Sequence, residues 1–339
     1  MILHNKPFLG SEEKKAVFKV LSSQRVSQGE EVLNFENDLC NFFGLPEGHA
    51  VVVSSGSSAL FLALWALKGK GKKVGFPVYS CAALRNAVGM LGSEEVFLDC
   101  AEDSPNINFN EAEKKGIDIL MAPSMFGIPI ELPNKRNYQV IEDLAQSFGA
   151  KVEGELIGLR GEVGICSFYA TKMFTSGGQG GAIISKDKKL IDNIRDYREF
   201  DCRDDTKLRF NFQMTDLQAA IGRVQLKKLP VFIKQREKWF NIYKDFNLNL
   251  IESKNKNYTP VRYRIVHQCT NPHEVIESLS KKNIKAIIPI EEKELLDKSK
   301  KYFFALKLAH STVSLPAHLA LSENQIRKIA EIVKSVSKN

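Results

Sequence analysis

Hydrophobic residues recur at helical spacing in the first part of the chain, between residues 10 and 45. A cap-like Ser11 is followed by two sets of apolar positions, which are Val17, Val20 and Leu21, and then Val32, Phe35, Leu39 and Phe42. This spacing predicts two amphipathic helices.

From residue 50 the pattern changes to seven short β-rich runs, each followed by a loop and a helical pattern. The runs occupy residues 51–53, 73–76, 95–98, 117–122, 139–141, 164–168 and 182–185. Strands that alternate with helices predict an α/β fold, with a mostly parallel seven-stranded sheet flanked by helices on both faces.

A long helical pattern from residue 215 to about residue 246 follows the last of these runs. After it the chain is rich in Lys and Asn at residues 253–257, and shorter βα-like patterns continue to the C-terminus. We therefore expect a large domain at residues 1–240, including the N-terminal helices, and a smaller α/β domain at residues 241–339.

Composition narrows the class of protein. Of the 339 residues, 43% are hydrophobic and 26% charged, which is typical of a globular chain, and the net charge of +8 is compatible with anionic small molecules as partners. No apolar stretch has the length of a membrane helix, and no nucleic-acid signature is visible, so we expect a cytoplasmic protein that binds neither membrane nor nucleic acid. The six cysteines form no C-x-x-C pair, which predicts separate thiols and no metal site.

Residues that directly follow the predicted strands carry the candidate chemistry, because ligands of such sheets bind beyond the carboxyl ends of the strands. Residues 54–58, Ser-Ser-Gly-Ser-Ser, open an apolar helix and suit a phosphate, although a capped helix start is an equally good interpretation. Asp143 follows another strand, where it either pairs with a buried cation or caps a turn.

Lys172 is the third candidate. It lies between apolar residues and a glycine-rich turn, in the sequence Cys166-Ser-Phe-Tyr-Ala-Thr-Lys172 followed by Met-Phe-Thr-Ser-Gly-Gly-Gln-Gly-Gly. A partly desolvated lysine can act as an amine nucleophile, whereas an isolated lysine is usually a surface residue.

In this order, the segments resemble the nucleotide-sugar aminotransferases of the DegT/DnrJ/StrS type, which belong to the fold-type-I pyridoxal phosphate enzymes. The resemblance extends over most of the chain. It is carried by Pro7-Phe-Leu-Gly-Ser-Glu-Glu, Gln28-Gly-Glu-Glu-Val-Leu-Asn-Phe-Glu, Ser55-Gly-Ser-Ser-Ala-Leu, Glu142-Asp-Leu-Ala-Gln-Ser-Phe-Gly, Ser167-Phe-Tyr-Ala-Thr-Lys and Ser314-Leu-Pro.

The resemblance implies a role for each site residue. Lys172 would hold pyridoxal 5′-phosphate as a Schiff base and later move the proton, and Asp143 would keep the pyridinium nitrogen protonated. Gln146 would lie near the ring and its 3-oxygen. The phosphate would be bound by Gly56, Ser57, Ser58 and Ser167, and by Asn211 of a neighbouring subunit, which implies a homodimer with shared active sites.

Three departures from the family pattern are visible, one over the cofactor face and two on the substrate side. Cys81 stands where family members usually place an aromatic ring over the cofactor, so Cys81 is expected to contact the cofactor unless Tyr79 supplies the ring. The turn after Lys172 is one residue longer than usual, and the His-Tyr pair often seen before the C-terminal substrate loop is missing around residues 287–291.

The resemblance implies transfer of an amino group, from a donor such as L-glutamate, to a keto sugar linked to a nucleotide, for amino-sugar biosynthesis. One alternative is a dehydratase of the same family that uses the same cofactor, although Lys172 excludes the type that has His at this position. The other alternative is a regulator that binds the cofactor and a sugar nucleotide without turnover.

Overall fold

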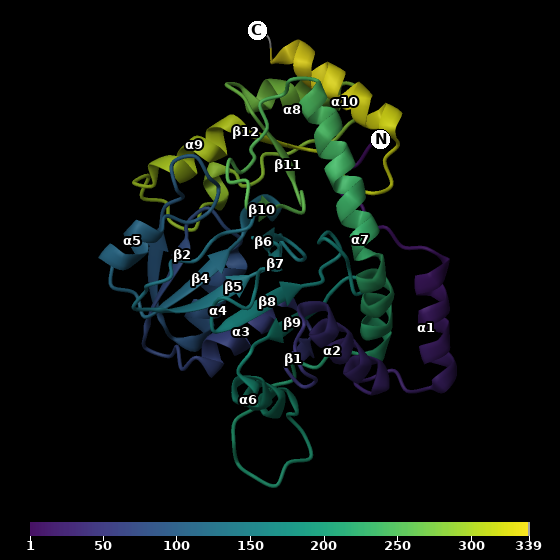
Figure 1. The fold of residues 1–339 in the computed structure, drawn as a ribbon, viewed down its shortest axis with the longest axis vertical. Helices are drawn as coiled ribbons and strands as arrows, with labels where there is room; N and C mark the ends of the chain where they lie inside the picture. The colour runs from purple at the N-terminus through teal and green to yellow at the C-terminus, as the bar shows by residue number, and fades with distance from the viewer. Residues whose placement is uncertain (338–339) are drawn as a thin grey trace.

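The computed structural model describes residues 1–337 and builds them around a seven-stranded sheet with the order β1-β9-β8-β5-β4-β2-β3 (Figure 1). Its strands are β1 (Ala50–Val53), β2 (Lys73–Pro77), β3 (Glu94–Leu98), β4 (Ile119–Pro123), β5 (Gln139–Asp143), β8 (Val163–Ser167) and β9 (Gly181–Ile184). Neighbouring strands are parallel except β9, which is antiparallel to both β1 and β8. The expected sheet is confirmed, and each strand overlaps one of the seven predicted runs.

The predicted helices are also confirmed. The first two are α1 (Ser11–Ser23) and α2 (Glu30–Phe43), and the long one is α7 (Asp216–Asp245), where the Thr215 side chain accepts a hydrogen bond from the Gln218 N–H. The remaining helices are α3 (Gly56–Ala66), α4 (Ala82–Leu91), α5 (Phe109–Lys114), α6 (Lys188–Arg198), α8 (Pro272–Ser280), α9 (Phe303–Ser311) and α10 (Glu323–Val336), with short 3₁₀ turns η1 (Met125–Gly127) and η2 (Glu292–Glu294).

The start of α1 differs in detail from the expectation. Ser11 is the first helical residue rather than the cap, and Gly10 is the capping residue. The Gly10 N–H donates to Glu13 Oε2 at 2.7 Å, so a carboxylate in the first turn satisfies the helix start without a serine hydroxyl.

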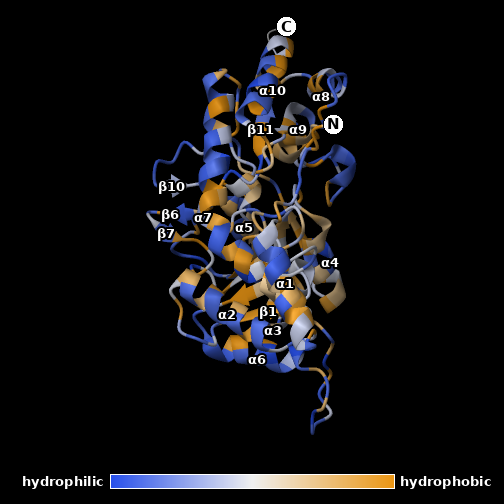
Figure 2. Ribbon diagram, turned by 90° about the vertical axis from the view of Figure 1, so that its right-hand side faces the viewer, coloured by the Kyte–Doolittle hydropathy of each residue, from blue (hydrophilic) through white to orange (hydrophobic). Residues whose placement is uncertain are grey.

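Both faces of the sheet are covered, as the uninterrupted apolar sequences of β1, β4 and β9 require. In β1, Val51 and Val53 pack into one core together with α3, α4 and α6, whereas Ala50 and Val52 pack into a second core with α2 and α7. Figure 2 shows β1 in the hydrophobic colour, while hydrophobic and hydrophilic positions alternate along α7 and α10.

The C-terminal part has its own core and lies at one end of the molecule (Figure 1). The antiparallel pair β11 (Ile265–Gln268) and β12 (Thr312–Leu315) packs there with α8, α10 and the second half of α7. A small sheet of β10 (Tyr258–Thr259), β6 (Lys151–Val152) and β7 (Glu155–Leu156) connects this part to the larger one. The proposed division at 240/241 falls within α7 and stays a prediction.

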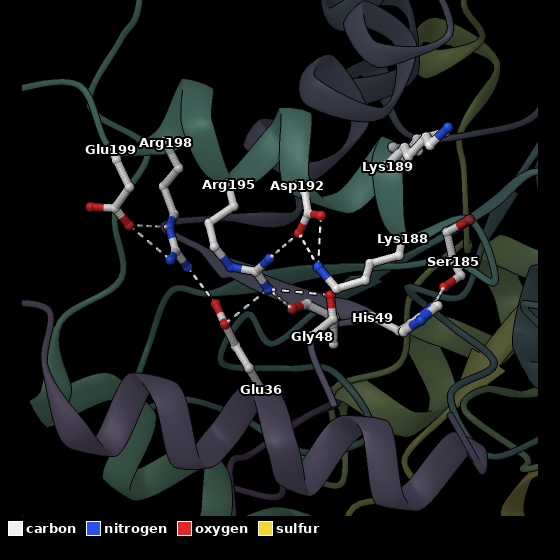
Figure 3. A network of polar contacts seen from close by, with 12 residues as sticks. Glu36, Gly48, His49, Ser185, Lys188, Lys189, Asp192, Arg195, Arg198 and Glu199 are labelled. Carbon is white, nitrogen blue, oxygen red and sulfur yellow. Dashed lines mark hydrogen bonds and ion pairs between the residues drawn. The ribbon is translucent and has the colours of Figure 1, made fainter. Parts of the chain in front are cut away.

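Side chains from two helices close the outer edge of β1, the first strand of the sheet (Figure 3). Glu36 of α2 accepts a hydrogen bond from the Val52 N–H at 3.1 Å, and Arg198 of α6 donates to both Glu36 and the Val52 carbonyl, the latter at 2.8 Å. Arg195 donates to the Ala50 carbonyl at 2.8 Å. The edge strand is thereby paired as it would be by another strand, which fixes the turn that follows it.

Candidate active site

The strand ends that carry the candidate residues meet at one edge of the sheet. β5 ends at Asp143 and β8 ends at Ser167, and the two strands are parallel neighbours. Gly181 of β9 is the pairing partner of both Val53 and Ser167, so the turn that follows β1 and the end of β8 lie on either side of this glycine. The topology therefore brings together segments that are up to 128 positions apart in the sequence (residues 53 and 181).

The turn after β1 is a capped helix start with free donors. The Ser55 side chain accepts a hydrogen bond from the Ser58 N–H at 3.1 Å, and the Ser58 hydroxyl lies 3.0 Å from that of Ser54. The Gly56 and Ser57 N–H groups belong to the first turn of α3, so they have no partner within the helix. The capped helix start is confirmed, because Ser55 caps α3. The two N–H groups lie at the positive end of the helix dipole, which suits a phosphate, and phosphate binding stays a prediction.

Two glycines allow this turn to approach its neighbours closely. A Cβ atom at Gly181 would lie 2.4 Å from the Ser55 carbonyl oxygen, and one at Gly56 would lie 2.8 Å from the Ser167 Cβ. Any side chain at either position would push the turn away from β8 and β9. The glycines therefore keep Ser167 beside the start of α3.

Asp143 is a buried carboxyl group with a single hydrogen bond to its own turn. It is 5% exposed, and its Oδ1 accepts from the Ala145 N–H at 2.8 Å. Burial raises the pKa of Asp143, against the opposing effects of the Ala145 N–H and of Lys172. A buried carboxylate of this kind is stabilised by a cation placed against it, which a protonated ring nitrogen would provide.

Lys172 lies on the loop that follows β8 and is held by its backbone. Its N–H donates to the Tyr169 carbonyl at 3.0 Å, and the side chain of Asn5 donates to the neighbouring Thr171 carbonyl at 3.0 Å. The Nζ atom lies 5.5 Å from the centre of the Tyr263 ring. Within residues 1–337 no carboxylate lies within 4.0 Å of this amine, although Lys172 is near enough to Asp143 to lower its pKa.

A threonine organises the glycine-rich turn after Lys172. The Thr175 hydroxyl accepts hydrogen bonds from the N–H groups of Gly177 and Gly178, at 3.1 and 3.2 Å, and donates to the Phe168 carbonyl at 3.1 Å. Gly177 has φ +81° and Gly178 has φ +139°, which only glycine adopts without strain. The turn therefore returns the chain to β9 directly behind Lys172.

The Gln146 side chain is hydrogen-bonded to the loop that follows β4. Its Oε1 accepts from the Phe126 N–H at 2.9 Å, and Phe126 has a left-handed φ of +60°. Gln146 thus stabilises a strained loop beside Asp143, and its implied position near a cofactor ring stays a prediction.

Cys81 and Tyr79 differ sharply in exposure. Cys81 is exposed and precedes the first residue of α4. Tyr79 is fully buried, its ring packs edge-on against Phe126 at 6.2 Å, and its hydroxyl has no hydrogen-bond partner. Tyr79 is therefore part of the core in this conformation, and Cys81 is the residue of this loop that is available for contact.

Asn211 lies on the segment between α6 and α7, which projects from the end of the molecule opposite α10 (Figure 1). Its side chain is exposed and accepts a hydrogen bond from the Gln213 N–H at 3.1 Å. The next residue, Phe212, accepts at its carbonyl from the Ser54 N–H at 2.8 Å. Asn211 is therefore next to the turn after β1 of its own chain, and its implied contact with a neighbouring subunit stays a prediction.

Sequence reasoning assigned no site role to several residues that the N-terminal segment, α7 and the C-terminal part contribute near Lys172, although Ser314 stood in one of the family-like motifs. They are His4, Asn5, Arg236, Tyr263, Arg264, Ser314 and His318. The one available signal was the run Arg262-Tyr263-Arg264 directly before β11, which places two cations and an aromatic ring at a strand start.

The arrangement fits pyridoxal phosphate by the chemistry of its groups. A helix start offers N–H donors for a phosphate, a buried carboxylate offers a partner for a ring nitrogen, and a lysine amine lies beside them. Among residues 1–337, no group of three His, Cys, Asp or Glu side chains could hold a metal ion. In the same part of the chain, every helix is too short or too polar to cross a bilayer.

Comparison with known proteins gives one consistent result. Residues 7–334 match the model of the DegT/DnrJ/EryC1/StrS aminotransferase family. The chain is 28% identical to the GDP-perosamine synthase of Escherichia coli O157:H7, with 96% of each chain covered. It is 32% identical to the dTDP-3-amino-3,4,6-trideoxy-alpha-D-glucose transaminase of Streptomyces venezuelae, over 65% of this chain and 61% of that protein. The fold is that of the aminotransferase TlmJ from Streptoalloteichus hindustanus, with a TM-score of 0.91 at 24% identity, over 99% of this chain and 98% of that one.

Proposed function

Because the chain belongs to the DegT/DnrJ/EryC1/StrS aminotransferase family, we propose that it transfers an amino group from an amino acid to a keto group of a nucleotide-linked sugar. The names of relatives support this substrate class, since they include a GDP-perosamine synthase and a transaminase of a dTDP-linked amino sugar. The donor is an amino acid such as L-glutamate, and the product is an amino sugar that remains attached to its nucleotide.

The observation that carries the proposal is the proximity of the buried Asp143 carboxyl group to the Lys172 amine at the sheet edge. A buried carboxylate and a lysine amine lie close enough to influence each other, and neither has an ion-pair partner within 4.0 Å among the described residues. Transamination requires both groups, one to hold a cofactor ring in its protonated form and one to act as an amine and as a proton carrier.

Each site residue then has a defined task. Pyridoxal phosphate, when bound, supplies an aldehyde that bonds to amines and a protonated ring that withdraws electrons from the amino-bearing carbon. Asp143 keeps the ring nitrogen protonated, and Lys172 Nζ, once free, moves the proton on the amino-bearing carbon. The N–H groups of Gly56 and Ser57, with the hydroxyls of Ser58 and Ser167, bind the phosphate.

The reaction is tested by adding L-glutamate alone to the purified cofactor-loaded protein. An aminotransferase should convert its cofactor to the aminated form and release one equivalent of 2-oxoglutarate for each site. The cofactor absorption reports the first event, and a coupled dehydrogenase assay reports the second. A regulator without turnover gives neither signal, and that outcome would reject the proposal.

We further propose that the protein is a homodimer in which Asn211 reaches the phosphate of the partner's site. Asn211 is exposed on a projecting segment whose apolar residues Leu208 and Phe210 are 91% and 63% exposed. A second copy that covers these residues would remove apolar surface from water. The cytoplasmic location expected from the sequence likewise stays a prediction, which cell fractionation can test.

Subunit complementation tests the shared site. Lys172→Ala and Asn211→Ala chains, each impaired as a homodimer, are unfolded and refolded together. With shared sites, one of the two sites in each heterodimer receives an intact Lys172 and an intact Asn211, so turnover should exceed that of either parent. If Asn211 serves its own chain, as its position beside Phe212 also allows, every site keeps one defect and mixing restores nothing.

A further inference from the structure

The segment that precedes α1 runs from the C-terminal part of the molecule to α7. At its start, Ile2 makes two backbone hydrogen bonds, of 2.8 and 2.9 Å, with residues 283–285. At its end, the Phe8 carbonyl accepts a hydrogen bond from the side chain of Gln225, on α7, at 2.9 Å. Residues 2–8 therefore form a strap that is fixed at both ends, and we call it the N-terminal strap.

A buried polar network reinforces the anchor at Phe8. Gln225 is 1% exposed, and its side-chain nitrogen also donates to Glu13 Oε1 at 2.7 Å. Glu13 is 3% exposed and accepts a further hydrogen bond from Lys228 Nζ at 2.7 Å. Burial acts to raise the pKa of Glu13, but the hydrogen bonds from Lys228, Gln225 and the Gly10 N–H lower it, so the carboxylate stays ionised. Hydrogen bonds to an ionised group are stronger than neutral ones, which makes this a firm anchor.

Asn5 lies midway along the N-terminal strap and contacts the loop that carries Lys172. Its side-chain nitrogen donates at 3.0 Å to the carbonyl of Thr171, which belongs to the peptide bond between Thr171 and Lys172. Asn5 is three positions from each anchor, and three residues span about 10 Å at full extension, so each half of the strap is a short tether. The strap therefore restricts where this peptide bond can lie.

Few other hydrogen bonds reach the Lys172 loop from outside it. In the part of the chain that the structure describes, the backbone of residues 170–175 is bonded to groups beyond the β8–β9 loop at two points. The Thr171 carbonyl accepts from Asn5, and the Thr175 N–H donates to the Gln225 side chain at 3.5 Å. The cavity left between strap and loop measures about 10 Å³, which is room for about one water molecule. The loop is thus held by the strap and by the anchor of the strap.

We propose that Asn5 is a positioning residue for the Lys172 amine and acts by holding the Thr171 carbonyl. The inference rests on the proposed function, in which Lys172 bonds to the cofactor aldehyde and later moves a proton. Both steps need the amine within reach of one atom, and a displacement of about 1 Å can slow such a step about a hundredfold. Since no carboxylate of the described residues lies within 4.0 Å of the amine, the backbone that carries Lys172 decides where the amine can reach.

The test separates bond formation from cofactor binding. Pyridoxamine 5′-phosphate has no aldehyde and cannot bond to an amine, so its Kd for cofactor-free protein, measured by titration calorimetry, reports binding alone. Stopped-flow absorption with saturating pyridoxal phosphate gives the first-order rate at which the bond to Lys172 forms. Asn5→Ala should slow this rate about three- to tenfold, as expected for the loss of one neutral hydrogen bond, and should leave the Kd of pyridoxamine phosphate unchanged within about twofold.

Two companion variants and a second measurement sharpen the comparison. Asn5→Gln keeps an amide donor on a longer side chain and should recover part of the rate. Leu9→Ala removes an apolar side chain that is 48% exposed just beyond the strap, and it should change neither the rate nor the Kd. Hydrogen exchange, read by mass spectrometry, should be faster in Asn5→Ala for the peptide that covers residues 170–174, because the loop has lost one of its two outer hydrogen bonds.

The outcomes distinguish this inference from the proposed function. If Asn5→Ala weakens pyridoxamine phosphate binding by the same factor as it slows bond formation, Asn5 supports the whole site and the positioning role is wrong. If neither quantity changes while wild-type protein reacts with L-glutamate, the inference is wrong and the function stands. If the rate depends on Asn5 but wild-type protein does not react with L-glutamate, the proposed function fails and the positioning role remains. Should Asn5→Ala not fold, Asn5→Asp replaces it, since it keeps the size but exchanges the donor for an acceptor, and an unchanged rate in that variant overturns the inference equally.

Discussion

Replacing Arg198 with methionine should destabilise the protein strongly, because Arg198 is half of a buried ion pair that also closes a strand edge. Glu36 is 3% exposed and Arg198 is 3% exposed. Arg198 donates to the Glu36 carboxylate and, at 2.8 Å, to the Val52 carbonyl. The change leaves the buried Glu36 carboxylate with the Val52 N–H and the more distant Arg195, at 3.4 Å, and it leaves the Val52 carbonyl without its Arg198 donor.

The expected loss follows from the removal of these two contacts. Breaking a buried pair by removing one partner costs about 3–5 kcal/mol, and we expect Arg198→Met to fall in this range. A double variant with Glu36→Gln removes the isolated charge as well, so it should lose less stability than the two single changes add up to, by about 1–3 kcal/mol. The control is Lys188→Met on the same helix, which breaks an exposed pair with Asp192 and should cost less than about 0.5 kcal/mol.

Urea unfolding gives the magnitude, and amide hydrogen exchange gives the location. In Arg198→Met the midpoint should shift to lower urea, and the amides of β1 and of residues 54–58 should exchange faster than those of β4 in the sheet centre. A stability loss as small as that of Lys188→Met would refute the reasoning. Uniform acceleration of amide exchange across the whole sheet would refute it as well, because the hydrogen bonds of Arg198 stabilise β1 in particular.

Three further predictions concern the site itself. Asp143→Asn should retain the cofactor but lose most turnover in a steady-state assay. In cofactor-free protein, the thermal stability of Asp143→Asn relative to wild type should increase with pH. The pKa of Asp143 is raised, so the wild-type carboxyl group stabilises the fold below its ordinary pKa of 3.8 and loses this contribution as the pH rises through the raised pKa. A constant difference in stability between the two proteins from pH 4 to pH 8 would contradict this. Gly181→Ala should weaken pyridoxal phosphate binding and lower the free energy of unfolding by about 1–3 kcal/mol, since its Cβ would lie 2.4 Å from a backbone oxygen. The control Gly89→Ala has open space in α4 and should raise the free energy of unfolding by about 0.5–1 kcal/mol. Iodoacetamide should modify the exposed Cys81 and Cys202, and cofactor binding should slow the reaction at Cys81 but not at Cys202, as read by peptide mass spectrometry. If the cofactor protects both cysteines equally, or neither of them, Cys81 does not contact the cofactor.

The sheet and the long helix could be predicted because the relevant signals are local. A fully buried strand such as β1 is apolar at every position, and α7 combines a regular apolar period with Thr215 as its cap. The two-residue strands β6, β7 and β10 were not predicted, since such short runs carry no period. The cap of α1 was misplaced by one residue because a carboxylate, rather than the Ser11 hydroxyl, satisfies the helix start.

The proximity of the candidate residues could be predicted where they follow strands, whereas the neighbours that do not follow strands were missed. Asp143 and Ser167 end neighbouring strands, so the topology alone brings them to one edge. His4 and Ser314 are 310 positions apart and meet through a single hydrogen bond. Contacts of this kind depend on how the two terminal parts pack against the sheet, and no period, spacing or turn residue in the sequence encodes them.

The central claim, that Lys172 is the amine that bonds to pyridoxal phosphate, is tested most directly by chemical labelling. The cofactor-loaded protein is reduced with borohydride, digested, and mapped by mass spectrometry, with a sample that received no borohydride as the blank. Our account predicts one equivalent of the reduced cofactor fixed on the peptide that contains Lys172, and none on any peptide of Lys172→Ala loaded in the same way. A label fixed on another lysine, or an undiminished label in the Lys172→Ala protein, would contradict it.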